Sequence, residues 1–139
     1  MSNKVITIAA AIILNEQNQI LLVRKKDTDF FMHVGGKLEP NELPEAALSR
    51  EVLEETGCEM EILSYIGKYE TVAANELNHS LVSYLYQVKL KSQPQVQVQV
   101  QVQAELAEMQ WVDLNHPDLP LAPLTRDISI PWCKQLLGI

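Results

Sequence analysis

The sequence contains few cysteines, few basic residues and no long apolar run, and each shortage excludes a class of protein. Its 139 residues include two cysteines, Cys58 and Cys133, whose separation matches no metal-binding or redox motif. We interpret both as reduced structural thiols and expect a cytoplasmic protein. The apolar run Val5–Leu14 is too short to span a bilayer. A polar turn follows it and no small-residue cleavage site is present, so a signal peptide is not predicted.

Positive charge is scarce, with 11 Lys and Arg against 18 Asp and Glu and a formal net charge of −7. A nucleic-acid polymer needs clustered basic side chains, so the composition argues against one as the main partner. A small phosphorylated substrate stays compatible, because a bound dication supplies positive charge locally. Hydrophobic residues make up 47% of the chain, which is ordinary for a soluble globular protein. The length favours a single domain over residues 1–139.

Residue patterns predict strands on both sides of one strongly marked helix. Val5–Leu14 and Ile20–Lys25 are β-rich runs joined by an Asn/Gln turn, which predicts a hairpin. Phe30–Val34 predicts a short strand that leads into a glycine pair. Pro44 is suited to the first turn of a helix, and Gly57 to its end. Further strands are predicted at Met60–Glu70, Ser80–Lys91 and Met109–Leu114, each rich in apolar residues.

Two segments near the end of the chain have patterns of their own. Residues 94–103 alternate Gln and Val, which predicts a long strand with one solvated face. The alternative is an edge that pairs with a second subunit, so a homodimer is a possible partner state. Thr125–Leu137 predicts a helix that is broken, or begins, near Pro131. Its core-facing residues are predicted to be Ile128, Trp132, Leu136 and Leu137.

Three glutamates share one face of the predicted helix. Glu51, Glu54 and Glu55 stand at positions i, i+3 and i+4, within a single turn. Like charges at this spacing destabilise a helix by roughly 0.2–0.5 kcal/mol per pair. A row of carboxylates beside a glycine turn is suited to Mg²⁺ or Mn²⁺, which converts the repulsion into attraction. The alternative is a solvated acidic surface without a ligand.

The residues around these glutamates resemble a known motif. Its fixed positions here are Gly36, Glu42, Arg50-Glu51, Glu54-Glu55 and Gly57, followed by an apolar residue. This pattern resembles the Nudix box of MutT-like hydrolases, and every polar and glycine position of that motif is matched. The last position normally carries a larger aliphatic residue and here holds Cys58, which packs as a small hydrophobe.

The resemblance implies both a fold and a reaction. The expected fold is α/β (α+β), a mixed sheet between helices with a loop-helix-loop catalytic motif. The expected activity is hydrolysis of a diphosphate linkage in a nucleoside triphosphate or nucleoside diphosphate derivative. Metal-activated water is the nucleophile, and no Ser, Cys or His nucleophile is indicated. The family's alternative substrates are ADP-ribose and nucleotide sugars. A non-catalytic nucleotide-sensing module is the alternative of another class.

The same resemblance assigns roles to individual residues. Mg²⁺, or Mn²⁺ in its place, is expected on Glu51, Glu54, Glu55 and the backbone carbonyl of Gly36. Arg50 is expected to orient Glu51 through an ion pair, and Glu42 to support the loop. The remaining candidates are Glu108 (preferred) or Glu105 as a further carboxylate, Arg24 and Lys37 as phosphate contacts, and Phe31 and His33 at a base pocket, with a core position as the alternative for Phe31.

Two departures from the family pattern bear on the substrate. Val34 precedes the glycine pair, where many members have proline. Pro123 stands where MutT-like enzymes that sanitise oxidised guanine nucleotides carry a base-reading asparagine, and proline cannot make that side-chain contact. The 8-oxoguanine assignment is therefore weakened and the substrate stays open.

Overall fold

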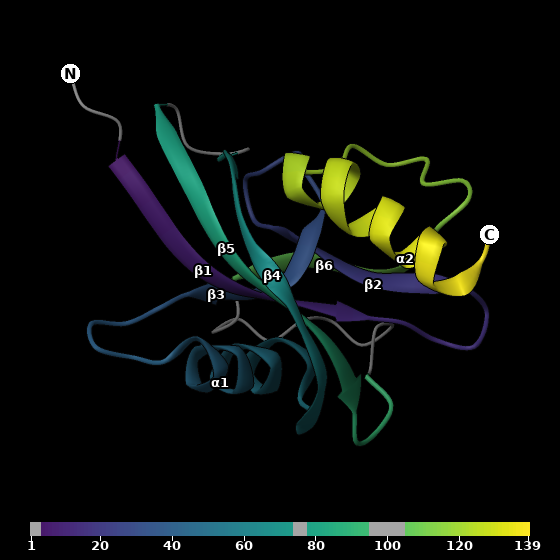
Figure 1. Ribbon diagram of the computed structural model, residues 1–139, viewed down its shortest axis with the longest axis horizontal. Helices are drawn as coiled ribbons and strands as arrows, with labels where there is room; N and C mark the ends of the chain where they lie inside the picture. The colour runs from purple at the N-terminus through teal and green to yellow at the C-terminus, as the bar shows by residue number, and fades with distance from the viewer. Residues whose placement is uncertain (1–3, 74–77, 95–104) are drawn as a thin grey trace.

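The computed structural model describes residues 4–73, 78–94 and 105–139, which form one mixed sheet with helices on both faces (Figure 1). This arrangement confirms the predicted α+β fold. The Gln/Val alternation at 95–104 lies outside the described residues. No helix within the described ranges is long and apolar enough to cross a membrane. The elements are β1 (Lys4–Ile13), β2 (Gln19–Lys25), β3 (Met32–Lys37), α1 (Pro44–Thr56), β4 (Met60–Val72), β5 (His79–Leu90), β6 (Leu106–Asp113), the π-helical turn η2 (Thr125–Ser129) and α2 (Ile130–Leu137).

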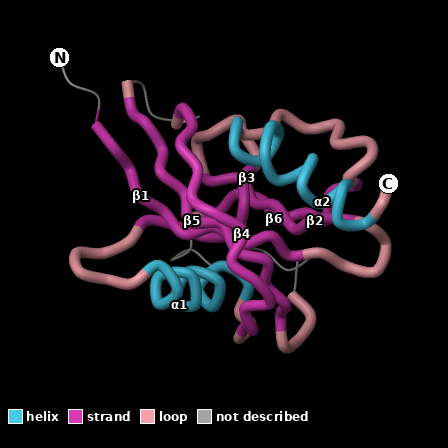
Figure 2. Tube along the Cα trace, viewed as in Figure 1, coloured by secondary structure: helices cyan, strands magenta, loops and turns pink. Residues whose placement is uncertain are grey.

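The strand order corrects one prediction. The six strands run β4-β5-β1-β3-β2-β6, with β1 parallel to β5 and every other neighbouring pair antiparallel. Figure 2 shows the strands between α1 on one side and α2 on the other. β3 therefore lies between β1 and β2, and the predicted hairpin of these two strands is wrong. Their direct contact is confined to the turn, where Leu14 bridges to Ile20 and Asn15 exchanges backbone and side-chain hydrogen bonds with Gln19. Beyond this turn the strands separate, because each pairs with β3.

Side chains of the central strands alternate between two cores. Ala9, Ala11 and Ile13 of β1 pack with the cluster under α1, whereas Ala10 and Ile12 pack with the cluster under α2. All five are at most 2% exposed. A strand covered on both faces reads as a continuous apolar run rather than an alternating one. This double burial explains the unbroken apolar run at residues 8–13 of β1.

Helix α1 has the boundaries that its sequence predicts. Pro44 is in the first turn, and Gly57 ends the helix in the left-handed conformation with φ 73°, its N–H donating to the Leu53 carbonyl at 2.9 Å. Leu43 makes no side-chain cap. The buried stripe that holds the helix on the sheet consists of Ala47, Leu48 and Val52, all fully buried. Packing therefore compensates for the missing cap.

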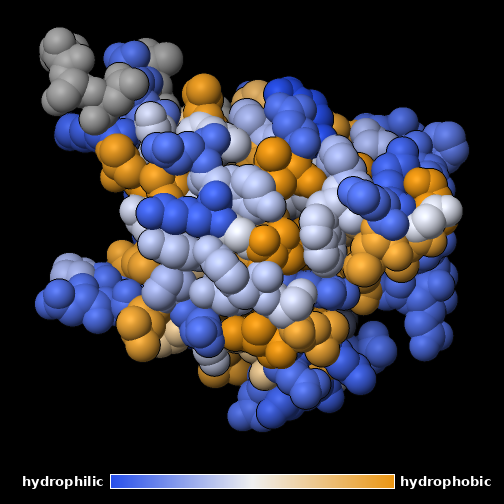
Figure 3. Space-filling view, viewed as in Figure 1, coloured by the Kyte–Doolittle hydropathy of each residue, from blue (hydrophilic) through white to orange (hydrophobic). Residues whose placement is uncertain are grey.

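The C-terminal helix differs in part from its prediction. The break near Pro131 is confirmed, because the π-helical turn η2 precedes α2 and Pro131 lies in the first turn of α2. Leu136 and Leu137 were predicted to face the core, and this is wrong, since they are 51% and 38% exposed. Apolar surface is visible at this end of α2 in Figure 3. A π turn shifts the face that the following residues present, and the buried positions are Ile130 and Cys133. The predicted Ile128 and Trp132 are partly buried against the same core.

The glycine pair lies inside β3 rather than in a turn. Gly35 is opposite Ala10 of β1 and has φ 149°. A Cβ on Gly35 would lie 2.1 Å from the backbone oxygen of Ala9. Only glycine lets the two backbones approach this closely. The pair is therefore a close-packing feature of the sheet centre.

We predict that Gly35→Ala is much more costly than Gly57→Ala. Both positions have positive φ, but nothing lies within 4 Å of a Cβ on Gly57. Gly57→Ala should lower the free energy of unfolding by about 1 kcal/mol through backbone strain alone. Gly35→Ala adds a backbone clash and should cost about 3 kcal/mol or more. Urea denaturation of both variants measures the difference, and equal losses would contradict the close-packing role.

Candidate active site

The box carboxylates meet the glycine pair where α1 packs against β3. The Gly35 N–H donates to Glu55 Oε1 at 3.1 Å. A Cβ on Gly36 would lie 2.5 Å from the carboxyl carbon of Glu51, so this carboxylate rests directly on the Gly36 backbone. Glu54, between them in sequence, is exposed on the surface of the helix. Two of the three predicted metal ligands are thus held at the backbone of the strand that carries Gly36.

Burial makes this pair of carboxylates unstable as free anions. Desolvation, together with the charges of Glu51 and Glu54, raises the pKa of Glu55 to about 8. The Gly35 hydrogen bond and the Lys25 charge oppose this rise. The pKa of Glu51 is also raised, first by desolvation, while its bond to Arg50 lowers it. Positive charge at this point would relieve the repulsion between the two carboxylates.

Arg50 ties the helix to the loop before it. Its Nε and Nη2 donate to the two carboxylate oxygens of Glu42 at 3.1 and 2.9 Å, and Nη1 donates to Glu51 Oε1 at 3.0 Å. Nη2 also donates to the Lys37 carbonyl at 3.2 Å. The contact with Glu51 is the one that the sequence indicates, and the two-oxygen contact with Glu42 adds to it. Arg50 lowers the pKa of Glu42, whose carboxylate also accepts the Glu39 N–H.

The donor set at this site suits a hard dication. Its candidate ligands are carboxylates and a backbone carbonyl, which are the oxygen donors that Mg²⁺ and Mn²⁺ prefer. The mutual repulsion of Glu51 and Glu55 is the electrostatic condition that a dication reverses. Within residues 4–73, 78–94 and 105–139, no three His, Cys, Asp or Glu side chains already form a gathered metal cluster. The donor chemistry therefore fits a metal, and Glu54 is its exposed member.

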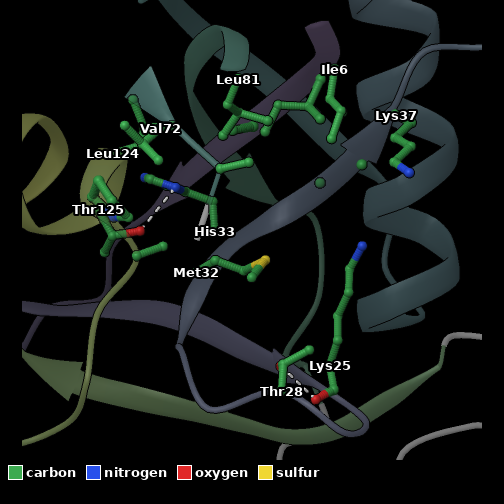
Figure 4. A pocket seen from close by; sticks show the side chains of 17 residues that line it. Ile6, Lys25, Thr28, Met32, His33, Lys37, Val72, Leu81, Leu124 and Thr125 are labelled. Carbon is green, nitrogen blue, oxygen red and sulfur yellow. Dashed lines mark hydrogen bonds between the residues drawn. The ribbon is translucent and has the colours of Figure 1, made fainter. Parts of the chain in front are cut away.

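A cavity of about 250 Å³ opens beside the glycine pair, and its two ends differ in chemistry (Figure 4). The ammonium groups of Lys25 and Lys37 lie at the end next to α1. His33 and Thr125 lie at the other end. Apolar residues dominate the rest of the wall, among them Ile6, Ile8, Val72, Leu81, Ala122 and Leu124. The cavity thus joins a cationic end, beside the carboxylates, to a mostly apolar end.

Lys25 is a site residue that sequence reasoning missed. It lines the cavity, and its charge lowers the pKa of both Glu51 and Glu55. The sequence signal was the basic run that begins at Arg24. Neighbouring residues on a strand point to opposite faces, so only one of the two could reach the box. Which one does so depends on the register of β2, which no local pattern reveals.

Arg24 and Glu108, predicted for separate roles, contact each other. They are directly paired residues of β2 and β6, and Arg24 Nε and Nη2 both lie 2.9 Å from Glu108 Oε1. Gln110 donates to Glu108 Oε2 at 2.8 Å, and with Arg24 it lowers the pKa of Glu108. Neither Arg24 nor Glu108 is among the residues that line the cavity. Glu105 is exposed at a turn, with φ 57°.

Phe31 takes its alternative position, in the core. It is 3% exposed, packs in the cluster under α2 and is not part of the cavity wall. Its side chain is in the core position given as the alternative, and its backbone bridges to Leu121 beside the wall. Lys37 and His33 do line the cavity, and Pro123, at the position of the missing asparagine, lines it as well.

Comparison with known proteins matches most of the chain to one family. A family model described as NUDIX domain matches residues 5–133. A putative 8-oxo-dGTP diphosphatase of Bacillus subtilis is 41% identical over 71 residues, which are 51% of this chain and 48% of that protein. An 8-oxo-dGTP diphosphatase of Haemophilus influenzae is 44% identical over 61 residues, 41% of this chain and 45% of that protein. The chain thus spans about half the length of the curated relatives it matches.

Solved structures share the fold over nearly the whole chain. A MutT protein from Methanosarcina mazei superposes with a TM-score of 0.77 at 21% identity, covering 100% of this chain and 99% of that one. An ADP-ribose pyrophosphatase from Streptococcus suis gives a TM-score of 0.65 at 20% identity, with 96% and 92% covered. A UDP-X diphosphatase gives 0.74 at 19% identity, with 99% and 66% covered. At these identities the likeness concerns the fold.

We predict that Glu55 makes the metal-free protein less stable as pH rises. Its pKa of about 8 exceeds the ordinary glutamate pKa of 4.5, so between these values the folded state holds a proton that the unfolded state has lost. The free energy of unfolding should therefore fall with rising pH across this window, by up to a few kcal/mol. Glu55→Gln keeps the acceptor for Gly35 and removes the charge. Denaturation with a chelator present, from pH 5 to about pH 9, measures both proteins.

The comparison with Glu55→Gln is needed because another buried group, His33, changes the free energy of unfolding in the opposite direction as pH rises. Burial lowers the pKa of His33 from 6.5 to about 4, so its effect raises stability as pH rises through that window. Both proteins retain His33, and its effect cancels in their difference. Parallel stability curves for the wild type and Glu55→Gln would contradict the buried-charge assignment.

Proposed function

Because the chain belongs to the Nudix family, we propose that it hydrolyses a diphosphate linkage in a nucleoside triphosphate or nucleoside diphosphate derivative. One observation carries this proposal. The carboxylates of Glu51 and Glu55 rest on the glycine pair at the cationic end of a cavity whose other end is mostly apolar. A molecule with phosphates at one end and a base at the other has the matching chemistry.

The proposed cofactor is Mg²⁺, with Mn²⁺ as a substitute. Glu51, Glu54, Glu55 and the carbonyl of Gly36 would hold it. When bound, such an ion neutralises diphosphate oxygens and lowers the pKa of a coordinated water. The carboxylates of Glu51 and Glu55 support this choice, because desolvation and neighbouring carboxylates raise their pKa values, and a bound dication would favour their charged forms.

The chain's own side chains orient the reacting groups. Lys25 and Lys37 are suited to bind phosphate oxygens at the cationic end of the cavity. Arg50 holds Glu51 in one rotamer by its 3.0 Å bond, and Glu42 holds Arg50 in turn. The Gly35 N–H fixes one oxygen of Glu55. Positioning of this kind favours in-line attack of water on phosphorus.

Glu108 is proposed as the further carboxylate in preference to Glu105. Its two oxygens are oriented by Gln110 and Arg24, and these hydrogen bonds lower its pKa. The main role proposed for Arg24 is therefore to orient Glu108, and contact with a phosphate is its secondary role. Glu105 lies exposed at a turn, without comparable orientation.

We favour a nucleoside triphosphate as the substrate class, because the curated relatives include 8-oxo-dGTP diphosphatases. ADP-ribose or a nucleotide sugar is the second candidate, as the family resemblance implies, and an ADP-ribose pyrophosphatase and a UDP-X diphosphatase share this fold. Pro123 in the cavity wall offers no side-chain donor to an oxidised guanine. A binding module without activity fits less well, since all three box glutamates are present.

A substrate panel tests the proposed function. Release of phosphate and pyrophosphate is measured with Mg²⁺, and then Mn²⁺, over nucleoside triphosphates, 8-oxo-dGTP, ADP-ribose, nucleotide sugars and dinucleoside polyphosphates. We expect turnover of a triphosphate that stops when the metal is chelated. Turnover that survives chelation would refute the metal assignment. Silence across the panel would favour the binding module, which calorimetry with the same compounds detects.

We predict that Glu54→Gln abolishes most turnover without unfolding the protein. The change removes a ligand charge from an exposed position and keeps the side-chain shape. The kcat should fall by more than about a hundredfold, while the urea midpoint stays near that of the wild type. Glu45→Gln is the matched control, because Glu45 is an exposed glutamate in the first turn of the same helix. Near wild-type kcat in Glu54→Gln would remove Glu54 from the metal site.

A further inference from the structure

The imidazole of His33 is held between two hydroxyl groups at the apolar end of the cavity. His33 Nε2 lies 2.5 Å from Ser129 Oγ, and Nδ1 lies 3.2 Å from Thr125 Oγ1. Figure 4 shows the bond to Thr125. His33 is 6% exposed, and both hydroxyl residues are fully buried. Every polar atom of the ring thus has a partner from η2.

The chemistry of this cluster favours a fixed arrangement. Thr125 and Ser129 are the first and last residues of η2, and residues four apart lie on one side of a helical turn. Burial lowers the pKa of His33 to about 4, so the ring is neutral at pH 7. A neutral ring has one donor and one acceptor nitrogen, and each hydroxyl takes the complementary role. Removing the ring would leave two buried hydroxyls without this partner, which costs more than the bonds themselves contribute.

A second anchor joins the same strand region to the same loop. The Phe31 N–H donates to the Pro120 carbonyl at 2.8 Å, and the Ala122 N–H donates to the Phe31 carbonyl at 2.9 Å. Residues 120–125 are therefore attached to the start of β3 at two points, through the backbone of Phe31 and the side chain of His33. Residues 122–125 of this loop form one wall of the cavity.

The strand that carries these anchors also carries the glycine pair. Gly35 follows His33 by two residues, and Gly36 by three, along an extended β3. A strand rises about 3.3 Å per residue, so the wall and the carboxylates are joined by a short, stiff segment. No flexible loop separates the two ends of the cavity along this path. A fixed spacing between them follows.

We propose that His33 is a positioning residue that holds the 122–125 wall at a set distance from the glycine pair, and so governs how tightly the nucleoside part of the substrate is held. It acts through Thr125 and Ser129 and not by contact with the reacting atoms. The inference rests on the proposed function for the identity of the ligand. The clamp itself, His33 with its two hydroxyl partners, is a property of the free protein.

The clamp is tested first without ligand, by hydrogen exchange. In His33→Phe, the amides of Ala122 and Arg126, which bond to the Phe31 and Ala122 carbonyls, should exchange about tenfold faster. Amides of α1 should keep their wild-type rates. Thr125→Val and Ser129→Ala should each give part of this effect. Unchanged exchange at both amides in His33→Phe would overturn the proposal, whatever the panel of substrates shows.

Kinetics with dGTP and Mg²⁺ then separates positioning from a general loss of structure. His33→Phe should raise KM about tenfold and change kcat by less than about twofold. Cys133→Ala is the matched control, because it truncates a fully buried side chain of the same core without touching the clamp. It should lower stability and leave KM unchanged. An equal rise of KM in Cys133→Ala, or a loss in kcat alone in His33→Phe, would overturn the positioning role.

A conservative variant supplies the last readout. His33→Asn places an amide near the position of Nδ1, so it retains a partner for Thr125 and loses the one for Ser129. Its KM should lie between those of the wild type and His33→Phe. A KM as high as that of His33→Phe would show that the hydrogen bonds are not what positions the wall. Absence of dGTP turnover in the wild type would count against the proposed substrate, and the exchange experiment would then decide the clamp alone.

Discussion

The site depends on one close contact, between the backbone of the β3 glycine pair and the carboxylates of α1. The Ala9 carbonyl occupies the space that a side chain on Gly35 would need, and the Gly35 N–H donates to Glu55. Gly36 has no side chain because the Glu51 carboxylate lies there. Packing and electrostatics therefore converge on two residues. Because both residues lack a side chain, β1 and β3 can approach closely, and the carboxylates of Glu51 and Glu55 can reach the β3 backbone, where they are partly or fully buried.

The charged groups around α1 differ in how well they are paired: Arg50 has carboxylate partners, whereas Glu55 has no direct cationic partner among the described residues. Arg50 is fully engaged by Glu42, Glu51 and the Lys37 carbonyl, which fixes the loop without recourse to any ligand. Glu55 accepts a hydrogen bond from the Gly35 N–H, and the charge of Lys25 also lowers its pKa. A protein tolerates such an imbalance where a ligand restores the balance, and buried groups with shifted pKa values are therefore typical of functional sites. Glu55 lies beside the cationic end of the cavity, through its bond to Gly35 in the cavity wall.

Local signals predicted the parts of the site that a single segment determines. The bounds of α1, its buried stripe and the shared face of the glutamates all follow from spacing within residues 44–57. Non-local pairing defeated the other predictions. The hairpin was wrong because β3 enters between β1 and β2, and the role of Lys25 was missed because it depends on the register of β2. The clamp joins His33 to Thr125 and Ser129, which lie far from it in sequence, so no local motif predicts it.

The parallel pairing of β1 with β5 has a consequence for how the chain folds. Lys4 pairs with His79 and Ile13 with Val88. β1 therefore lies inside the sheet, and one of its two neighbours, β5, comes much later in the sequence. Contacts this distant in sequence are slow to form, because the entropy of closing a long loop is lost before the contacts stabilise the chain. Helix α1 has its own start and stop signals, and it docks mainly on β3 and β1, which pair with each other. The contact between its carboxylates and the glycine pair can therefore form before β5 joins β1.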